Sequence, residues 1–246
     1  MPKRADLGEY TLNEITPYSY PSSEVKETFK FTGKLALEFF EQQPGTSLDV
    51  GCANGALTQH LVGLFPKTVF TGIDMTPQFI EVANNLKLKN SKFITQDIDK
   101  YSQNSKEKFD LVTCIGTLGM SENPSATVKQ LIGLTKFKGG LLIIESNFNY
   151  SDFDVRIEYR KSTKEIVEEY SYGLDSMSVG LISSELDAIG VKYHFRKMPF
   201  YKEIPRVPES LIPRWYTINH PMNEGEKLLI NDLGMYKQHS FLVIAP

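Results

Sequence analysis

LDVGCANG, at residues 48–55, is the stretch of sequence that decides the fold, because it lies between an apolar run and a helical pattern. It predicts a buried strand, then a glycine turn, then a helix. Gly51 and Gly55 lack Cβ atoms, so the backbone can take a positive φ and approach a ligand, while the following helix presents free N–H groups. Asp49, at the end of the strand, would repel a phosphate and attract an ammonium group. The stretch therefore favours an amino-acid nucleoside over a dinucleotide as the ligand.

Four more apolar runs follow, and polar residues cluster where these runs end. The second predicted strand ends at Asp74, 25 positions after Asp49 (74 − 49), where a carboxylate can accept both hydroxyls of a ribose. The third ends at Asp97, the fourth leads into Ile115, and the fifth ends at Glu145. Ligands of open α/β sheets bind at these carboxyl ends. The four strands are expected over residues 69–74, 92–97, 109–114 and 141–145.

Helical patterns alternate with these strands along the chain. Ser22 or Ser23 is the expected cap of a first helix that ends near Pro44, and Thr76 is the expected cap of the helix after the second strand. Such alternation forces parallel strands with right-handed crossovers. The later helices are expected over residues 56–64, 77–88, 125–137 and 178–189, and the last two strands over residues 191–195 and 241–244.

With these strand ends in place, the chain resembles the class I S-adenosylmethionine-dependent methyltransferases over about residues 24–200 and the last strand. The resemblance implies an α/β fold with a Rossmann-like, doubly wound, mostly parallel seven-stranded sheet in the order 3-2-1-4-5-7-6 and an antiparallel last strand. It also implies S-adenosyl-L-methionine as the cofactor. Ala53 departs from the family pattern, since it replaces the middle glycine of the common Gly-x-Gly-x-Gly turn. It is small enough for the turn to close.

The resemblance assigns residues to the parts of this cofactor. Asp49, Gly51 and Gly55 would meet its methionine part, and Asp74 would meet its ribose. The acids also have plainer roles, because an acid after a strand often caps the next helix or opens a turn. Independent caps have no reason to fall at successive strand ends, so the joint pattern favours the cofactor site.

Further residues would complete the cofactor site. Met75 would lie against the adenine face, although a methionine there also suits the core. Asp97, with the backbone of Ile98, would meet the adenine amino edge, and Ile115 would offer its backbone carbonyl to the methionine ammonium. Tyr20, on an N-terminal arm, would cover the cofactor with its ring near the sulfonium charge.

Composition narrows the class of function. The chain has 246 residues, a formal net charge of −3 and a pI near 5.9, so it has no overall basic field for a nucleic acid or an anionic membrane. No apolar run approaches the length of a membrane span and no signal-peptide pattern opens the sequence, so we expect a cytoplasmic protein. Two cysteines make no disulfide framework, and four histidines without ligand spacing indicate no metal site.

This length suits one methyltransferase domain over residues 1–246, with an arm and helix in residues 1–45 and the cofactor-binding half in residues 46–146. Residues 147–177 and 200–239 do not fit that framework, and both are rich in aromatic side chains. Long irregular excursions often form lids or binding loops, so we expect these two to bind a small-molecule acceptor. The alternatives are a satellite hydrophobic cluster or a homodimer contact.

Two residues are candidates for a general base, which helps when the acceptor must lose a proton. His220, in the second aromatic excursion, is the first candidate, and Glu145, at the end of the fifth strand, is the second. The plainer interpretations are a surface histidine and a strand-end acid bonded to a backbone turn.

The absence of three motifs disfavours several classes of methyl acceptor. Residues 115–118, IGTL, replace the Asn/Asp-Pro-Pro-aromatic loop of enzymes that methylate adenine or glutamine. Cys114 follows Thr113 rather than the proline that precedes the nucleophile of cytosine C5 enzymes. Residues 145–147 read Glu-Ser-Asn where metal-dependent catechol enzymes carry Asp-Asn. The sequence therefore favours metal-independent methyl transfer to an oxygen or nitrogen of a small molecule.

Two other classes of function remain open at this point. An NAD-dependent oxidoreductase would use a similar sheet, but Asp49 would then face pyrophosphate, and Ala53 and Ala56 stand where Gly-x-Gly-x-x-Gly requires glycines. A non-catalytic protein could keep the fold and use its aromatic excursions as an interaction surface. Binding of the two cofactors separates the first class from a methyltransferase.

Overall fold

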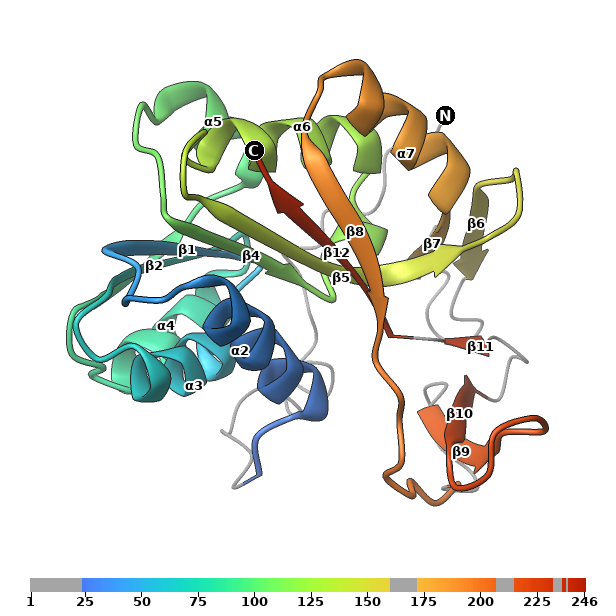
Figure 1. Cartoon of the computed structure of the whole chain (residues 1–246). Coiled ribbons are helices and arrows are strands. Elements are labelled where there is room, and N and C mark those ends of the chain that lie inside the picture. The colour runs from blue at the N-terminus through green and yellow to red at the C-terminus, as the bar shows by residue number, and fades with distance from the viewer. Residues whose placement is uncertain (1–23, 160–171, 207–214, 232–235, 238) are drawn as a thin grey trace, which may run out of the picture.

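The computed structural model describes residues 24–159, 172–206, 215–231, 236–237 and 239–246. Within them a central sheet lies between two layers of helices: α2, α3 and α4 cover one face, and α5, α6 and α7 cover the other (Figure 1). The helices are α2 (Glu27–Phe39), α3 (Ala56–Leu64), α4 (Pro77–Asn85), α5 (Ile98–Asn104), α6 (Pro124–Leu134) and α7 (Val179–Ala188), with a short 3₁₀ helix η1 (Leu118–Met120). None of these described helices has both the length and the apolar character needed to cross a bilayer.

Seven strands form the main row of the sheet, in the order β3-β2-β1-β4-β5-β12-β8. The first five are parallel, and β12 is antiparallel to both of its neighbours. β1 lies between β2 and β4, so that Asp49 is opposite both Gly72 and Thr113. The predicted order, with an antiparallel last strand inserted beside the fifth, is confirmed. These strands are β1 (Thr46–Val50), β2 (Val69–Asp74), β3 (Ser91–Thr95), β4 (Leu111–Ile115), β5 (Leu141–Asn149), β8 (Lys192–Lys197) and β12 (Ser240–Ala245).

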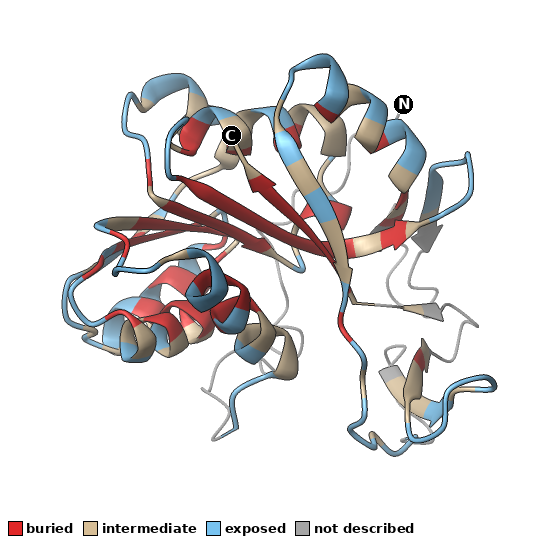
Figure 2. Ribbon diagram, in the orientation of Figure 1, coloured by how far each residue is buried: buried red, intermediate tan, exposed pale blue. Residues whose placement is uncertain are grey.

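Alternating side chains of the central strands pack against the two helix layers. Leu142 and Ile144 of β5 belong to the apolar cluster that includes residues of α6 and α7, whereas Leu141 and Ile143 belong to the cluster that includes residues of α2 and α3. This period of two, with both faces apolar, is what a parallel sheet covered on both sides requires. Figure 2 shows the result as a continuous buried band through β1, β4, β5 and β12.

The first aromatic excursion is more regular than expected. β5 continues to Asn149, and β6 (Val155–Tyr159) and β7 (Tyr172–Ser178) form an antiparallel pair. Residues 147–149 of β5 extend beyond its pairing with β4 and β12, and they pair in parallel with residues 176–178 of β7. The main sheet therefore has nine strands rather than seven, because the free end of β5 offers backbone groups to β7.

The second excursion also contains strands. β9 (Trp215–Asn219), β10 (Lys227–Asn231) and β11 (Tyr236–Lys237) form a separate three-stranded antiparallel sheet, which Figure 1 shows below β7. Strands in the described parts of both excursions correct the prediction of long irregular segments, although residues 200–206 have no regular secondary structure.

Several helix boundaries also differ from the sequence predictions. α2 begins at Glu27, an acid in the first turn that interacts favourably with the helix dipole. The predicted caps, Ser22 and Ser23, lie outside the described residues. α4 ends at Asn85 rather than residue 88, since Lys87 takes a positive φ of 49°. α6 begins after Asn123, whose side chain accepts from Ala126 N, and it ends at residue 134 instead of 137. α5 was not predicted.

Candidate functional site

The glycine turn after β1 has the backbone geometry that its sequence predicted. Gly51 and Gly55 have φ values of 71° and 78°, and Ala53 has 45°. The amides of Gly51 and Cys52 both donate to Ile73 O, at 2.9 and 3.0 Å, which ties the turn to β2. A Cβ atom on Gly51 would overlap the side chain of Thr117, which follows β4. The turn is therefore packed tightly between the ends of β2 and β4.

Asp49 lies beneath this turn with only 2% of its surface exposed. Its Oδ1 accepts from Thr113 Oγ1 of β4 and its Oδ2 accepts from Thr58 Oγ1 of α3, each at 2.9 Å. Burial raises the pKa of Asp49 to about 6, against the lowering effect of the two hydroxyl donors. With both oxygens engaged, Asp49 holds β1, β4 and α3 together, and its predicted contact with the cofactor ammonium stays a prediction.

Asp74 links the glycine turn to the next strand end. Its Oδ2 accepts from Ala53 N at 3.0 Å and its Oδ1 accepts from Thr76 N at 2.9 Å. Burial raises the pKa of this carboxyl, and the backbone donors at Thr76 and Ala53 oppose that rise. A carboxylate has about four lone-pair sites, so two backbone bonds leave capacity for ribose hydroxyls. Met75, directly after it, is 39% exposed, as a side chain that meets a ligand face would be.

Asp97 caps α5, a helix that was not predicted. Its Oδ1 accepts from Asp99 N at 2.8 Å and from Lys100 N at 3.4 Å, and α5 begins at Ile98. Asp97 therefore acts as a helix cap, as the plainer interpretation of this acid predicted. Both Asp97 and Ile98 are half-buried at the carboxyl end of β3, so the predicted adenine contacts remain open to them.

Ile115 and Gly116 form the corresponding end of β4. Ile115 is half-buried, and Gly116 is exposed with a φ of 73°. The amide of Gly116 donates to Glu145 O at 3.1 Å, which joins this strand end to β5. Together with the close approach of Thr117 to Gly51, this bond brings the ends of β1, β4 and β5 side by side. The sequence predicted this convergence, while the cofactor contact of Ile115 stays a prediction.

Glu145 is almost fully buried and lies beside a lysine and a histidine. Its Oε1 is 2.6 Å from His239 Nδ1 and 3.6 Å from Lys237 Nζ. Burial alone would raise the pKa of Glu145, but the charge of Lys237 and the hydrogen bond from His239 outweigh it and hold this pKa at about 2. His239 was not among the predicted site residues. The antiparallel pairing of β12 with β5, which places Phe241 opposite Glu145, brings His239 to this strand end.

His220 lies in the turn between β9 and β10. Its Nδ1 accepts from the backbone amides of Met222 and Asn223 at 3.1 and 3.0 Å, and its own amide donates to Glu226 O. A neutral imidazole that accepts at Nδ1 carries its proton on Nε2, so this ring is arranged to hold the turn. Its predicted role as a base has no support from these contacts and stays a prediction. Tyr20 lies outside the described residues.

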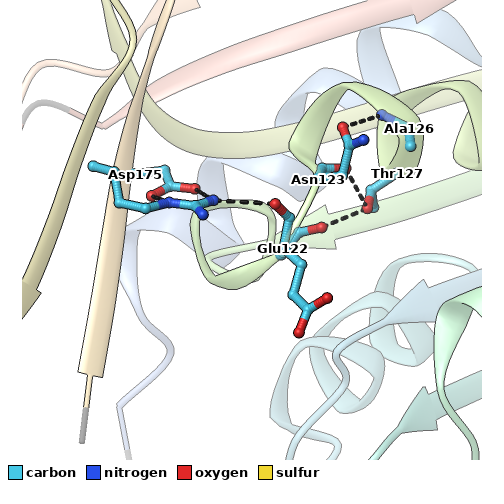
Figure 3. A network of polar contacts seen from close by, with 7 residues as sticks. Glu122, Asn123, Ala126, Thr127 and Asp175 are labelled. Carbon is cyan, nitrogen blue, oxygen red and sulfur yellow. Dashed lines mark hydrogen bonds and ion pairs between the residues drawn. The ribbon is translucent and has the colours of Figure 1, made fainter. Parts of the chain in front are cut away.

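The β6–β7 pair is fastened to the segment before α6 by a charged contact. Arg156 donates through Nε and Nη2 to the two carboxylate oxygens of Asp175, at 2.9 and 2.7 Å, and Nη2 also donates to Glu122 O at 3.1 Å. Figure 3 shows this network with the Asn123 cap of α6 beside it. A cavity of about 240 Å³ opens here between the β6–β7 pair and the first turns of α6 and α7. Its apolar wall includes Val155, Met177 and Ile182.

The acids of this edge have separate partners rather than a common centre. Among the described residues, no three His, Cys, Asp or Glu side chains are grouped so that they could hold a metal ion. Both cysteines are free and buried, at Cys52 in the glycine turn and at Cys114 in β4. Burial raises the pKa of both thiols.

Comparison with known proteins agrees with this arrangement. A family model described as "Methyltransferase domain" matches residues 42–187, which is more than half of the chain. A malonyl-[acyl-carrier protein] O-methyltransferase of Halalkalibacterium halodurans is 28% identical over 144 residues, covering 56% of this chain and 52% of that protein. A ubiquinone biosynthesis O-methyltransferase of Coxiella burnetii is 30% identical over 126 residues, covering 48% and 53%. The chain thus spans about half the length of these two relatives.

Solved structures share the fold over most of the chain. The plantazolicin methyltransferase BamL, in complex with a triazolic desmethylPZN analog and SAH, has a TM-score of 0.55 and 18% identity, covering 93% of this chain and 88% of that one. The N-terminal domain of EvdMO1 with SAH bound has a TM-score of 0.56 and 14% identity, covering 89% and 81%. From the match over residues 42–187 and the confirmed strand order, the chain belongs to the methyltransferase-domain family, with the fold of the class I S-adenosylmethionine-dependent methyltransferases.

Proposed function

We propose that this protein transfers a methyl group from S-adenosyl-L-methionine to an oxygen or nitrogen atom of a small-molecule acceptor, without a metal ion. The observation that carries the proposal is the convergence of the glycine turn, Asp74 and the Ile115–Gly116 strand end at one edge of the sheet. The residues present fit the cofactor, because Gly51 and Gly55 have the positive φ that close backbone approach requires, and Asp74 keeps lone pairs beside the exposed Met75.

The cofactor, when bound, would supply an activated methyl group with a sulfonium sulfur as the leaving atom. The chain's own contribution is then to bind, orient and exclude water. Asp74 would hold the ribose hydroxyls, Met75 would cover the adenine, and the carbonyl of Ile115 would orient the methionine ammonium. Asp49 would support the glycine turn from below through Thr58 and Thr113.

The β6–β7 pair and the cavity beside it support binding of a small-molecule acceptor. The β6–β7 pair extends β5 at the same edge of the sheet, and the cavity of about 240 Å³ beside it has both apolar and charged walls. Both relatives described above are O-methyltransferases by name, which supports an oxygen acceptor.

Metal independence is supported by what the acids of the site contact. Asp49 accepts from two hydroxyls, Glu145 contacts His239 and Lys237, and Asp175 is paired with Arg156. Each carboxylate already has donors of its own, so none is directed toward a shared cation.

The two free, buried thiols support a reducing, cytoplasmic location.

Isothermal calorimetry tests the cofactor directly. The wild type should bind S-adenosylmethionine and S-adenosylhomocysteine with micromolar affinity, and Asp74→Ala should weaken both by about 1.5–3 kcal/mol, because charge-assisted hydrogen bonds are lost. Glu81→Ala, on the neighbouring helix α4, is the control and should bind like the wild type. Wild-type protein that binds neither compound, or an Asp74 variant with unchanged affinity, contradicts the proposed site.

Transfer of a radiolabelled methyl group to pooled phenols, alcohols, amines and carboxylic acids tests the reaction. The label should enter an oxygen or nitrogen compound, and exhaustive chelation should leave the rate unchanged. A rate that chelation abolishes and magnesium restores contradicts the metal-independent proposal.

A further inference from the structure

A buried acid–histidine pair lies at the carboxyl edge of the sheet, where parallel strands present their ligand-binding ends. Glu145 belongs to β5, and His239 precedes β12, whose first residue, Ser240, pairs with Ser146. His239 Nδ1 and Glu145 Oε1 are 2.6 Å apart, and the two side chains are 13% and 2% exposed. The pair is thus held by two adjacent strands that the fold fixes in register.

The pair borders the expected methionine end of the cofactor. Gly116 directly follows Ile115, and its amide donates to Glu145 O at 3.1 Å. Glu145 Oε2 would lie 3.7 Å from a Cβ atom placed on Gly116, so the carboxylate faces this exposed glycine. Phe200 packs against the histidine ring, with the ring centroids 5.8 Å apart.

Glu145 is itself poorly suited to take a proton near neutral pH. Burial raises its pKa, but Lys237 and His239 hold it at about 2, far below the range in which a general base works well. A permanently ionised carboxylate is instead a good acceptor for an imidazole N–H. When Nδ1 of the neutral ring donates to Glu145, Nε2 is left with a lone pair.

We propose that His239 is the general base of the methyl transfer and that Glu145 is the positioning residue that orients it. This inference rests on the proposed function and names the proton acceptor for it. In the step, the proton of the acceptor's hydroxyl or ammonium group passes to His239 Nε2. The electron pair of that bond becomes the lone pair that bonds to the methyl carbon, and the bond between that carbon and sulfur breaks with its electron pair remaining on sulfur. Glu145 stays ionised and stabilises the imidazolium that forms.

Other charged groups face this pair and affect the pH dependence of its protonation. Lys237 Nζ is 3.6 Å from Glu145 Oε1, and the charge of Lys26, at the start of α2, also acts on it. Glu226 and Lys227, around the start of β10, line a cavity of about 10 Å³ together with His239. Such a cavity is close to the size of one water molecule.

His239→Asn separates the base from the structural contact. An asparagine can still donate an N–H to Glu145 from near the position of Nδ1, but it has no nitrogen that takes up a proton. His194→Asn is the matched control, because His194 is an exposed histidine on β8, in the same sheet. Both variants should bind S-adenosylmethionine in calorimetry as the wild type does.

Para-substituted phenols are the probes, from 4-methoxyphenol, which is protonated at neutral pH, to the more acidic 4-nitrophenol, which is partly ionised there. His239→Asn should lower transfer to 4-methoxyphenol by about 100-fold at neutral pH. The loss should shrink for 4-nitrophenol and at high pH, where no base is needed. His194→Asn should stay within twofold of the wild type. Glu145→Gln should lower the rate about tenfold and move the acidic limb of the pH–rate profile to lower pH, since the imidazolium loses its carboxylate.

A second readout needs neither cofactor turnover nor acceptor. Nitrogen NMR of the full chain, with His239→Asn for assignment and at a pH where the ring carries a single proton, should show that proton on Nδ1 of His239. A proton on Nε2 overturns the assignment of the base. Transfer that does not depend on His239, with an unchanged pH profile, also overturns it while leaving the proposed function intact. A wild type that methylates no acceptor overturns the proposed function and this inference with it.

Discussion

At the scale of single residues, Asp49 links stability to pH. It is fully enclosed between β1, β4 and α3, and burial raises its pKa to about 6 from an ordinary value of 3.8. A raised pKa in the folded state means that the folded chain binds the proton more tightly than the unfolded chain. The resulting stabilisation is fully present below about pH 4 and is lost as the pH rises through 6.

Asp49→Asn should remove this dependence. The free energy of unfolding of the wild type, relative to the variant, should fall by about 3 kcal/mol between pH 4 and pH 7, because a shift of one pKa unit corresponds to about 1.4 kcal/mol. Urea unfolding of both proteins at several pH values measures the difference. Two stability curves that run parallel across this range would show that Asp49 titrates normally in the folded chain.

Gly51 offers a test of the tight turn, with Gly139 as its matched control. Both glycines have a positive φ, of 71° and 72°, so an alanine costs about 1 kcal/mol of backbone strain at either position. Only at Gly51 would the new methyl group overlap Thr117, whereas at Gly139 it meets nothing within 4 Å. We expect Gly51→Ala to lower the free energy of unfolding by about 1–3 kcal/mol more than Gly139→Ala does.

A second substitution checks the cause of that difference. Thr117→Ala, added to Gly51→Ala, removes the Oγ1 and Cγ2 atoms in the overlap and should restore part of the lost stability in thermal or urea unfolding. Equal costs at Gly51 and Gly139, or a double variant with no recovery, would mean that the turn relaxes away from Thr117.

Single-residue roles were predictable only where they depend on local order. The roles of acids at the ends of apolar runs and of glycines in the first turn could be predicted from the sequence alone. The hydrogen-bond partners of Asp49 and Glu145 could not, because Thr113 is 64 positions from Asp49 and His239 is 94 positions from Glu145. Only the antiparallel register of β12 brings the second pair together.

At the scale of elements, the β6–β7 pair depends on Arg156. Only three residue pairs join β7 to β5, and the bidentate contact with Asp175 adds a link to the segment before α6 through Glu122 O. The side chain of Asp175 is 8% exposed, so its charge needs this partner.

Arg156→Lys keeps the charge and removes the fork that matches the carboxylate. We expect the free energy of unfolding to fall by about 1–2 kcal/mol and the amides of β6 to exchange hydrogen faster. Arg196→Lys is the control, since its contact with Glu38 is exposed and should matter by less than about 0.5 kcal/mol. Unchanged exchange in β6 would show that backbone pairing alone holds this element.

Element types were easier to predict than element ends. The helix after β2 was expected from Thr76 and Pro77, and it forms there, but a positive φ at Lys87 stops it early. α5 has seven residues, none of them buried, so its sequence carries little apolar periodicity. β6 and β7 form strands because they pair with each other and because β7 pairs with the end of β5. No local sequence pattern predicts these pairings.

At the scale of the whole molecule, the order of strands determines which distant segments can share a ligand. Because β1 and β4 are neighbours, the glycine turn and the Ile115–Gly116 end lie at the same edge although they are far apart in sequence. The sequence predicted this order through family resemblance, since pairing between parallel strands leaves little local trace. A homodimer contact through the aromatic segments stays a prediction, which analytical ultracentrifugation tests.

The two cysteines report on this edge in the intact protein. Cys52 follows β1 and Cys114 belongs to β4; they are 5% and 1% exposed, and burial raises the pKa of both thiols. Alkylation must therefore wait for the edge to open. A ligand that binds only the closed form lowers the population of the open form by a factor of 1 + [L]/Kd. S-adenosylhomocysteine at 100 times its Kd should therefore slow the alkylation of both cysteines by about 100-fold. Mass spectrometry of partly alkylated protein follows each thiol, and guanidinium-unfolded protein, in which both react quickly, is the control. Protection of one cysteine without the other would mean that the ligand does not bridge β1 and β4.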